Sequence, residues 1–337
     1  MNSYEILHQI AAIIQSASTI LITGQGNPDG DSVGAELALH DIISQQRQPG
    51  GSLPEIVICN DDPVPPHYDF FPNIGRIQPV EQTQGRRFEV GFVVDSGTSR
   101  LQQVLPLLQT CQRIINIDHH QSRAAGIETL AWIEPQISSV CEMVYGFFEH
   151  PAWRVALTPD IAACLYAGMI YDTGVFRYPN TTPRTLEVAG KLIGTGIDFA
   201  RIVEQLLLEK RLSALRLLAA VLDSVRVNAT GEVIWGRVTQ DMLRRAGATF
   251  DDEEGMISQF AFTKGTKVAA LFKEFGEQMT KISFRSRGAL DVGNVAKSLT
   301  PQGGGHDRAA GCTMHTPLIE AERAVIAALE RALAQPS

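Results

Sequence analysis

The sequence has neither a long apolar run nor a basic N-terminal start. No stretch approaches the ~18 consecutive apolar residues of a membrane-spanning helix. The opening MNSYEILHQIAAIIQ is typical of an amphipathic helix rather than of a secretory signal. We therefore expect no membrane partner and a cytoplasmic location.

Cysteine is scarce and scattered along the chain. None of the five cysteines belongs to a CxxC pair. An odd number of isolated cysteines argues against both a disulfide framework and a zinc site built from thiolates. We expect these side chains to be reduced and mostly buried.

A continuous basic stripe is also missing. Residues 1–214 carry 14 Lys and Arg against 23 Asp and Glu, while residues 215–337 carry 15 against 14. Proteins that bind long nucleic acids need a basic footprint. The sequence therefore excludes long nucleic acid as a partner and concentrates its acidic side chains in the first part.

Short β-rich runs alternate with helical patterns in the first half of the chain. This alternation predicts an α/β fold, a parallel sheet with helices on both faces. The strands are expected at 18–24, 55–60, 90–95 and 113–118, and the helices at 32–46, 139–149 and 158–171.

The second half predicts a smaller α+β domain. We expect three parts: a metal-binding catalytic domain over 1–181, a helical connector over 182–225 and a substrate-binding domain over 226–337. Within and beyond the connector, β-like runs occupy 218–229, 232–238, 267–273 and 279–285, and helical patterns occupy 291–299 and 317–334.

Acidic and histidine side chains follow the predicted strands or end a predicted helix. A lone DGD is most often a turn, but four such segments in one order indicate a metal site at the carboxyl ends of the strands. A mixed set of Asp and His suits Mn²⁺ or Mg²⁺. The candidates are Asp29 and Asp31 in NPDGD, Asp95 in VVDSG, Asp118, His119 and His120 in IDHHQS, and Asp172 in YDTGVF.

These residues resemble the motifs of the DHH phosphoesterases, a family named for the Asp-His-His stretch at 118–120. The later GGGHDRAAGC (303–312) is similar to the signature of the DHHA1 domain that follows the DHH domain in one branch. The layout is most similar to the nano-RNase/pAp phosphatase type. That type hydrolyses very short oligonucleotides and 3′-phosphoadenosine 5′-phosphate (pAp).

The resemblance implies two bound metal ions, Mn²⁺ or alternatively Mg²⁺. Asp29 and Asp95 would hold the first ion. Asp31, Asp95, His119 and Asp172 would hold the second, so that Asp95 bridges both. Two cations would activate a hydroxide for attack on phosphorus.

Three residues are assigned to the reaction itself by the resemblance. Asp95 would bridge the ions, His120 would face the substrate phosphate, and Asp118 would orient a histidine or the backbone. In the C-terminal domain, the residues expected to bind substrate are Arg285, Ser286, Gly304, Gly305 and His306.

Gln25 departs from the family pattern. The motif usually reads His-x-Asn-Pro-Asp-x-Asp, and glutamine stands here at the histidine position. An amide oxygen ligates a hard cation but is a poorer ligand of Mn²⁺ than imidazole. We therefore expect a weaker first metal site.

The sequence thus predicts a phosphoesterase that converts short oligonucleotides or nucleoside bisphosphates into mononucleotides. A phosphodiesterase of cyclic or linear dinucleotides is the alternative, because the same catalytic core serves those substrates. A catalytically impaired nucleotide sensor is a further one, supported by Gln25 alone. The predicted partners are the small nucleotide substrates, and a homodimer is left open.

Overall fold

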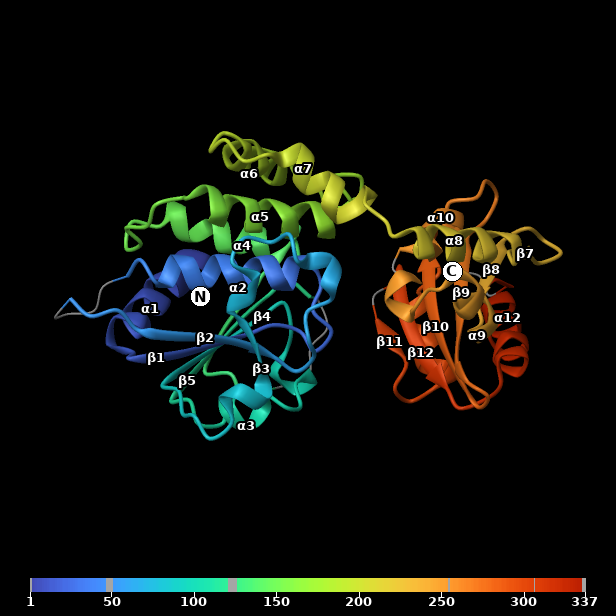
Figure 1. Ribbon diagram of the computed structural model, residues 1–337, viewed down its shortest axis with the longest axis horizontal. Helices are drawn as coiled ribbons and strands as arrows, with labels where there is room; N and C mark the ends of the chain where they lie inside the picture. Colours follow the sequence, from blue (N-terminus) through green and yellow to red (C-terminus); the bar gives the residue numbers. More distant parts are fainter. Residues whose placement is uncertain (1, 47–50, 121–125, 254, 306, 335–337) are drawn as a thin grey trace. The chain divides into compact units, whose positions relative to one another are not determined.

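The protein is described here as a computed structural model that covers residues 2–46, 51–120, 126–253, 255–305 and 307–334. The chain divides into two compact units, Met1–Glu209 and Lys210–Ser337, and each contains its own six-stranded sheet (Figure 1). The boundary between the units falls inside the segment 182–225 that was expected to be a connector. The predicted fold class is confirmed.

The sheet of the first unit is parallel throughout, with the strand order β3-β2-β1-β4-β5-β6. Its inner strands correspond to the four predicted ones. The strands are β1 (Thr19–Thr23), β2 (Glu55–Asn60), β3 (Ile77–Pro79), β4 (Val90–Val94), β5 (Arg113–Asp118) and β6 (Leu130–Ile133).

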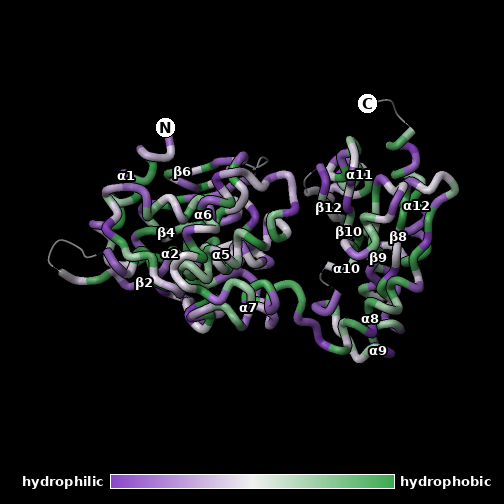
Figure 2. Tube along the Cα trace, turned by 90° about the horizontal axis from the view of Figure 1, so that it is seen from above, coloured by the Kyte–Doolittle hydropathy of each residue, from purple (hydrophilic) through white to green (hydrophobic). Residues whose placement is uncertain are grey.

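Both faces of this sheet are covered. Because side chains alternate along a strand, Ile20 and Ile22 of β1 join one core, while Leu21 joins the other. The larger core lies under α1 (Ser3–Ser16), α2 (Gly30–Ile43), α4 (Val140–Tyr145) and α5 (Pro159–Asp172), and α6 (Pro183–Ile193) and α7 (Phe199–Val203) pack outside α5 (Figure 1). The opposite core lies under α3 (Leu105–Leu108) and short 3₁₀ turns. Figure 2 colours much of the region around β4 and α2 as hydrophobic.

The second unit is an α+β domain with the strand order β11-β12-β10-β9-β8-β7. Among the described strands of this unit, only the pair β8 and β9 is parallel. Its strands are β7 (Arg226–Val227), β8 (Val233–Val238), β9 (Val268–Gly276), β10 (Met279–Ser286), β11 (Gly304–Gly305) and β12 (Ala309–Met314). Its helices are α8 (Leu212–Asp223), α9 (Gln240–Ala246), α10 (Met256–Ala261), α11 (Val292–Leu299) and α12 (Leu318–Ala334).

One predicted strand of this unit is wrong. The first half of the run 218–229 continues helix α8 to Asp223, and only Arg226–Val227 of the run pairs as a strand with β8. Leu217 and Val221 of α8 are fully buried at the spacing of one helix turn, and they pack under the sheet. That apolar spacing favours the helix over the strand.

In the described part of the chain, no helix is both long enough and apolar enough to cross a bilayer.

Helices α2 and α5 approach each other closely at Gly34 of α2. A Cβ added to Gly34 of α2 would lie 2.5 Å from the carbonyl oxygen of Cys164 in α5 and 3.1 Å from the Sγ of Cys141. Only a residue without a side chain fits this contact. The glycine therefore lets α2 lie between the sheet and α5, so that all of its first ten residues are buried.

We predict that Gly34→Ala lowers the free energy of unfolding by about 1–3 kcal/mol, because the new methyl group overpacks the contact with the α5 backbone. The matched control is Gly190→Ala on α6, where an added Cβ meets nothing within 4 Å. That change should raise stability by up to ~1 kcal/mol through helix propensity alone. Urea unfolding measures both, and equal stabilisation by the two substitutions would contradict the close packing of α2 on α5.

Candidate functional site

The candidate residues of the first unit lie at the carboxyl ends of β1, β4 and β5, except Asp172, which is the last residue of α5. Strands β1 and β4 are neighbours, but the chain continues from β1 to β2 on one side and from β4 to β5 on the other. This makes the β1/β4 edge a topological switch point, which is where open α/β sheets bind ligands.

Asp29 begins helix α2 as its N-cap. One oxygen of its carboxylate accepts hydrogen bonds from the backbone N–H groups of Asp31 and Ser32, both at 3.0 Å. Desolvation and the nearby charge of Asp31 raise the pKa of Asp29 to about 6, although hydrogen bonds from Ser32 and from the Gln25 side chain act in the opposite direction. The Gln25 side chain therefore acts on the acid that it was expected to accompany.

Asp31 is fully buried in the first turn of α2. Its two oxygens accept hydrogen bonds from Val140 N–H at 2.6 Å and Cys141 N–H at 3.0 Å, at the N-terminus of α4. Desolvation and repulsion by Asp172 raise the pKa of Asp31 to about 6. The free N–H groups at the start of α4 thus orient this carboxylate.

Asp95 follows β4 in a left-handed backbone conformation with a φ of 56°. Its carboxylate is 2% exposed, and within the described part of the chain its Oδ1 has no hydrogen-bond partner. Desolvation and the charges of neighbouring aspartates, first among them Asp29, raise the pKa of Asp95 well above its usual value. A buried carboxylate oxygen without a donor has a place for a cation.

His119 lies between two of these acids. Its Nε2 is 3.0 Å from Asp172 Oδ2 and 3.6 Å from Asp95 Oδ1, and its Nδ1 is 3.3 Å from the carbonyl oxygen of Ile137. Desolvation lowers the pKa of His119, but the hydrogen bond and charge of Asp172 outweigh it and raise the pKa to about 9. A proton on this ring would balance part of the negative charge of the two acids.

His120 is held by Asp118. The Nδ1 of His120 lies 2.7 Å from Asp118 Oδ1, and the same oxygen accepts the backbone N–H of His120 at 3.0 Å. Burial raises the pKa of Asp118, but the hydrogen bonds and charge of His120 outweigh it, so the pKa is lowered. An ionised Asp118 therefore orients the ring of His120.

The structure brings most of the predicted acidic and histidine residues of the first unit together, but Asp29 and Asp118 belong to neither group of candidate ligands. Two groups of three ligand atoms lie within 4.8 Å of one another and would suit a metal ion: Asp31, His119 and Asp172, and Asp95, His119 and His120. Carboxylate and imidazole donors of this kind fit Mn²⁺ or Mg²⁺.

Sequence reasoning missed the groups that hold these ligands. The side-chain amide of Asn116 donates hydrogen bonds to the carbonyl oxygens of Val93 at 3.0 Å and Ser96 at 2.6 Å, on either side of Asp95. This amide fixes the backbone that carries the left-handed Asp95. An asparagine inside the apolar run RIINID was the available signal.

The predicted substrate residues of the second unit share one corner of its sheet. Arg285 on β10 is paired with Ala309 on β12, and Gly305 on β11 is paired with Ala310 on β12. Gly305 has a φ of 135°, which favours glycine. Ser286 is buried, and among the described residues its Oγ has no hydrogen-bond partner. Gly304 lies beside Gly305 in β11, whereas His306 lies outside the described residues.

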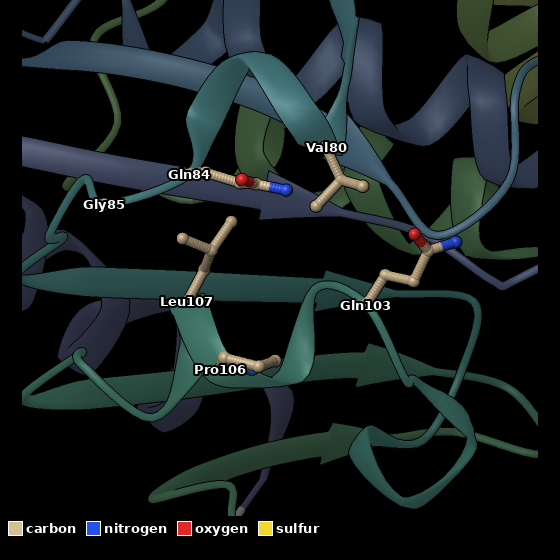
Figure 3. Close-up of a pocket in the computed structure, with 6 residues that line it drawn as sticks. All are labelled: Val80, Gln84, Gly85, Gln103, Pro106 and Leu107. Carbon is tan, nitrogen blue, oxygen red and sulfur yellow. The ribbon is translucent and has the colours of Figure 1, made fainter.

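A pocket on the first unit is separate from this cluster. Figure 3 shows it between the 3₁₀ turn Val80–Thr83 and helix α3. Its lining contains no titratable side chain: Val80, Gln84, Gly85, Gln103, Pro106 and Leu107. It offers none of the chemistry found at the strand ends.

The parallel-sheet unit with its acid and histidine cluster, followed by the α+β unit, defines a two-domain phosphoesterase. The DHH family N-terminal domain matches residues 19–169, and the DHHA1 domain matches residues 233–335, so the chain belongs to the DHH phosphoesterases that carry a DHHA1 domain.

Similar proteins cover most of the chain. A bifunctional oligoribonuclease and PAP phosphatase, NrnA of Thermus thermophilus, is 28% identical over 92% of this chain and 89% of that protein. The cyclic-di-AMP phosphodiesterase GdpP of Bacillus subtilis is 26% identical over 89% of this chain, but over only 46% of its own length. An exopolyphosphatase-related protein from Bacteroides fragilis shares the fold, with a TM-score of 0.88 at 23% identity over 97% of this chain and 96% of that one.

The perturbed groups predict how stability depends on pH and on divalent cations. A pKa raised by folding contributes stability that is present below the unfolded-state pKa and is lost as the pH rises through the folded-state pKa. For Asp29 and Asp31, this stability is lost as the pH rises from 3.8 to about 6. For His119, it is lost as the pH rises from 6.5 to about 9. Without divalent cations, the site should therefore destabilise the protein progressively as the pH rises.

We predict that Mn²⁺ or Mg²⁺ raises the Tm more at about pH 8 than at about pH 5, because protons compete with the cation for the same side chains. Differential scanning fluorimetry with and without a chelator measures this difference. The control is Asp69→Asn, which alters an exposed acid outside the cluster and should leave the difference unchanged. A cation effect that is equal at both pH values would contradict the prediction.

Proposed function

We propose that this protein hydrolyses very short oligonucleotides and pAp to mononucleotides, using two divalent cations, preferably Mn²⁺. The observation that carries the proposal is the cluster of aspartates and histidines around the buried Asp95, one oxygen of which has no hydrogen-bond partner among the described residues. Likeness to the oligoribonuclease and PAP phosphatase over nearly the full length supports this substrate class.

The proposed ligands divide between two ions. Asp29, Asp95 and the amide of Gln25 would hold the first, and Asp31, Asp95, His119 and Asp172 would hold the second. The clustering of Asp31, His119 and Asp172 supports the second set, and the contact of Gln25 with Asp29 supports the first. When bound, the ions would supply a nucleophile at neutral pH and neutralise charge on the phosphate.

The remaining residues of the cluster would act on the substrate. The carboxylate of Asp118 accepts a hydrogen bond from the Nδ1–H of His120. A proton on the Nε2 of the same ring would then be directed to a phosphate oxygen or a leaving-group oxygen. In the second unit, Arg285 and the backbone at Gly304 and Gly305 would bind the remote phosphate, with Ser286 and His306 beside them. Binding energy from that phosphate would position the scissile bond.

The proposal is tested by a panel of substrates with Mn²⁺: pAp, the dinucleotide pApA, cyclic-di-AMP, a long single strand and pyrophosphate. We expect pAp and pApA to be the best substrates, and Asp95→Asn to lower kcat by about 100-fold or more, because charge stabilisation at the reacting phosphate is lost. The exposed Asp69→Asn should keep full activity.

Different outcomes separate the alternatives. Preference for cyclic-di-AMP would favour the second candidate function, for which the likeness to GdpP is the supporting observation. Preference for pyrophosphate, or binding of nucleotides without turnover by the unaltered protein, would overturn the proposal.

Gln25 predicts an unequal pair of metal sites. We expect calorimetry of the metal-free protein to show one tighter and one weaker Mn²⁺ site, because an amide is a poorer ligand than imidazole. Gln25→His should tighten the weaker site by about 10-fold or more and leave the other unchanged. Two equally tight sites that do not respond to the substitution would show that Gln25 does not limit metal binding.

A further inference from the structure

Glu36 is a buried acid that the proposed reaction does not use. It lies on α2, its side chain is fully buried, and among the described residues no Lys, Arg or His forms an ion pair with it. Desolvation raises the pKa of Glu36 to about 8, although hydrogen bonds from Asn60 and Ser32 oppose the shift. A carboxyl group buried in a core without an ion pair destabilises a protein unless hydrogen bonds satisfy its oxygens.

Both oxygens of Glu36 accept hydrogen bonds from buried polar side chains. The hydroxyl of Ser32 donates to Oε1 at 3.0 Å, and the amide of Asn60 donates to Oε2 at 2.9 Å. Ser32 is in the first turn of α2, and Asn60 is the last residue of β2. Glu36 therefore links a helix to a strand that lies 24 residues further along the chain.

Each of these two partners holds one backbone N–H of the loop after β1. Asn60 Oδ1 accepts the N–H of Gly24 at 2.9 Å, and Ser32 Oγ accepts the N–H of Gln25 at 3.1 Å. Glu36 thus fixes the orientation of both acceptors. These two hydrogen bonds hold the backbone at Gly24 and Gln25, shortly before the NPDGD motif.

The loop passes directly against this carboxyl group. A Cβ added to Gly24 would lie 1.9 Å from Glu36 Oε1 and 2.0 Å from Ser32 Oγ. Only glycine permits this approach, so the glycine at 24 and the acid at 36 depend on each other. The next residue is Gln25, whose side chain is near enough to Asp29 to lower the pKa of that carboxyl group.

We propose that Glu36 is a positioning residue of the first metal site: through Ser32 and Asn60 it fixes the backbone at Gly24 and Gln25 and so holds the Gln25 amide beside Asp29. The inference rests on the proposed function, because it assigns Gln25 to a metal site. An amide ligand binds weakly, so it depends more on being held in place before the cation arrives.

The test compares Glu36→Gln and Glu36→Leu with the unaltered protein. Glutamine keeps the size of the side chain and one acceptor oxygen, whereas leucine removes both acceptors. We expect Glu36→Leu to weaken the weaker Mn²⁺ site by about 10-fold or more, with a smaller effect of Glu36→Gln and an unchanged tighter site. Calorimetry and the EPR signal of free Mn²⁺ measure both affinities.

A second readout needs no metal. In the metal-free protein, amide hydrogen exchange over the peptide that contains Gly24 and Gln25 should be faster in Glu36→Gln, relative to the rest of α2 and β1. The matched control is Leu39→Ala, on the same helix and also fully buried, which creates a cavity outside the network. It should lower the Tm but leave both Mn²⁺ affinities and the local exchange pattern unchanged.

The outcomes distinguish this inference from the function on which it rests. If the unaltered protein binds fewer than two Mn²⁺ ions, the two-metal function fails, and the assignment of Glu36 fails with it. If it binds two and both Glu36 variants retain both affinities, or if Leu39→Ala weakens the same site equally, only the positioning role is overturned. If Glu36→Leu does not fold, unchanged affinities and exchange in Glu36→Gln overturn the inference alone.

Discussion

The gathering of carboxyl groups with little access to solvent is the constraint on which the candidate site depends. Desolvation first, and then the charges of neighbouring acids, raise the pKa values of Asp29, Asp31, Asp95 and Asp172, and among the described residues no Lys or Arg forms an ion pair with them. Backbone N–H groups at the starts of α2 and α4 orient two of these acids instead. Because these donors are dipoles rather than full charges, most of the negative charge stays available to a cation.

The parallel sheet and the meeting of its ligands could be predicted from the sequence. Apolar runs that end in Asp95 and Asp118 mark strand ends, and parallel strands place their carboxyl ends at one edge. The same reasoning was wrong at 218–229, because Leu217 and Val221 continue the one-turn spacing of a helix into that run. The short helices α9 and α10 were not predicted.

The supports of the site could not be predicted from the sequence. Asn116 acts on the segment around Asp95, and Val140 acts on Asp31 from 109 residues away. Glu36 acts on the backbone at Gly24 and Gln25 through the side chains of two other residues, Ser32 and Asn60. Such contacts follow from the packing of α2 against the sheet and α4, and no local pattern of hydropathy or spacing marks them.

The ligands and their supports respond differently to the change at position 25. Replacing an imidazole by an amide alters the strength of one metal bond, but the path of the backbone there is set by Ser32, Asn60 and Glu36. One oxygen of Asp29 already accepts two N–H groups of α2, so the Gln25 amide and a cation would have to share the remaining lone pairs of that carboxylate. The two proposed metal sites therefore differ in more than one ligand. The second has a histidine held by Asp172 and Ile137, whereas the first relies on a preorganised loop to compensate for a weak donor.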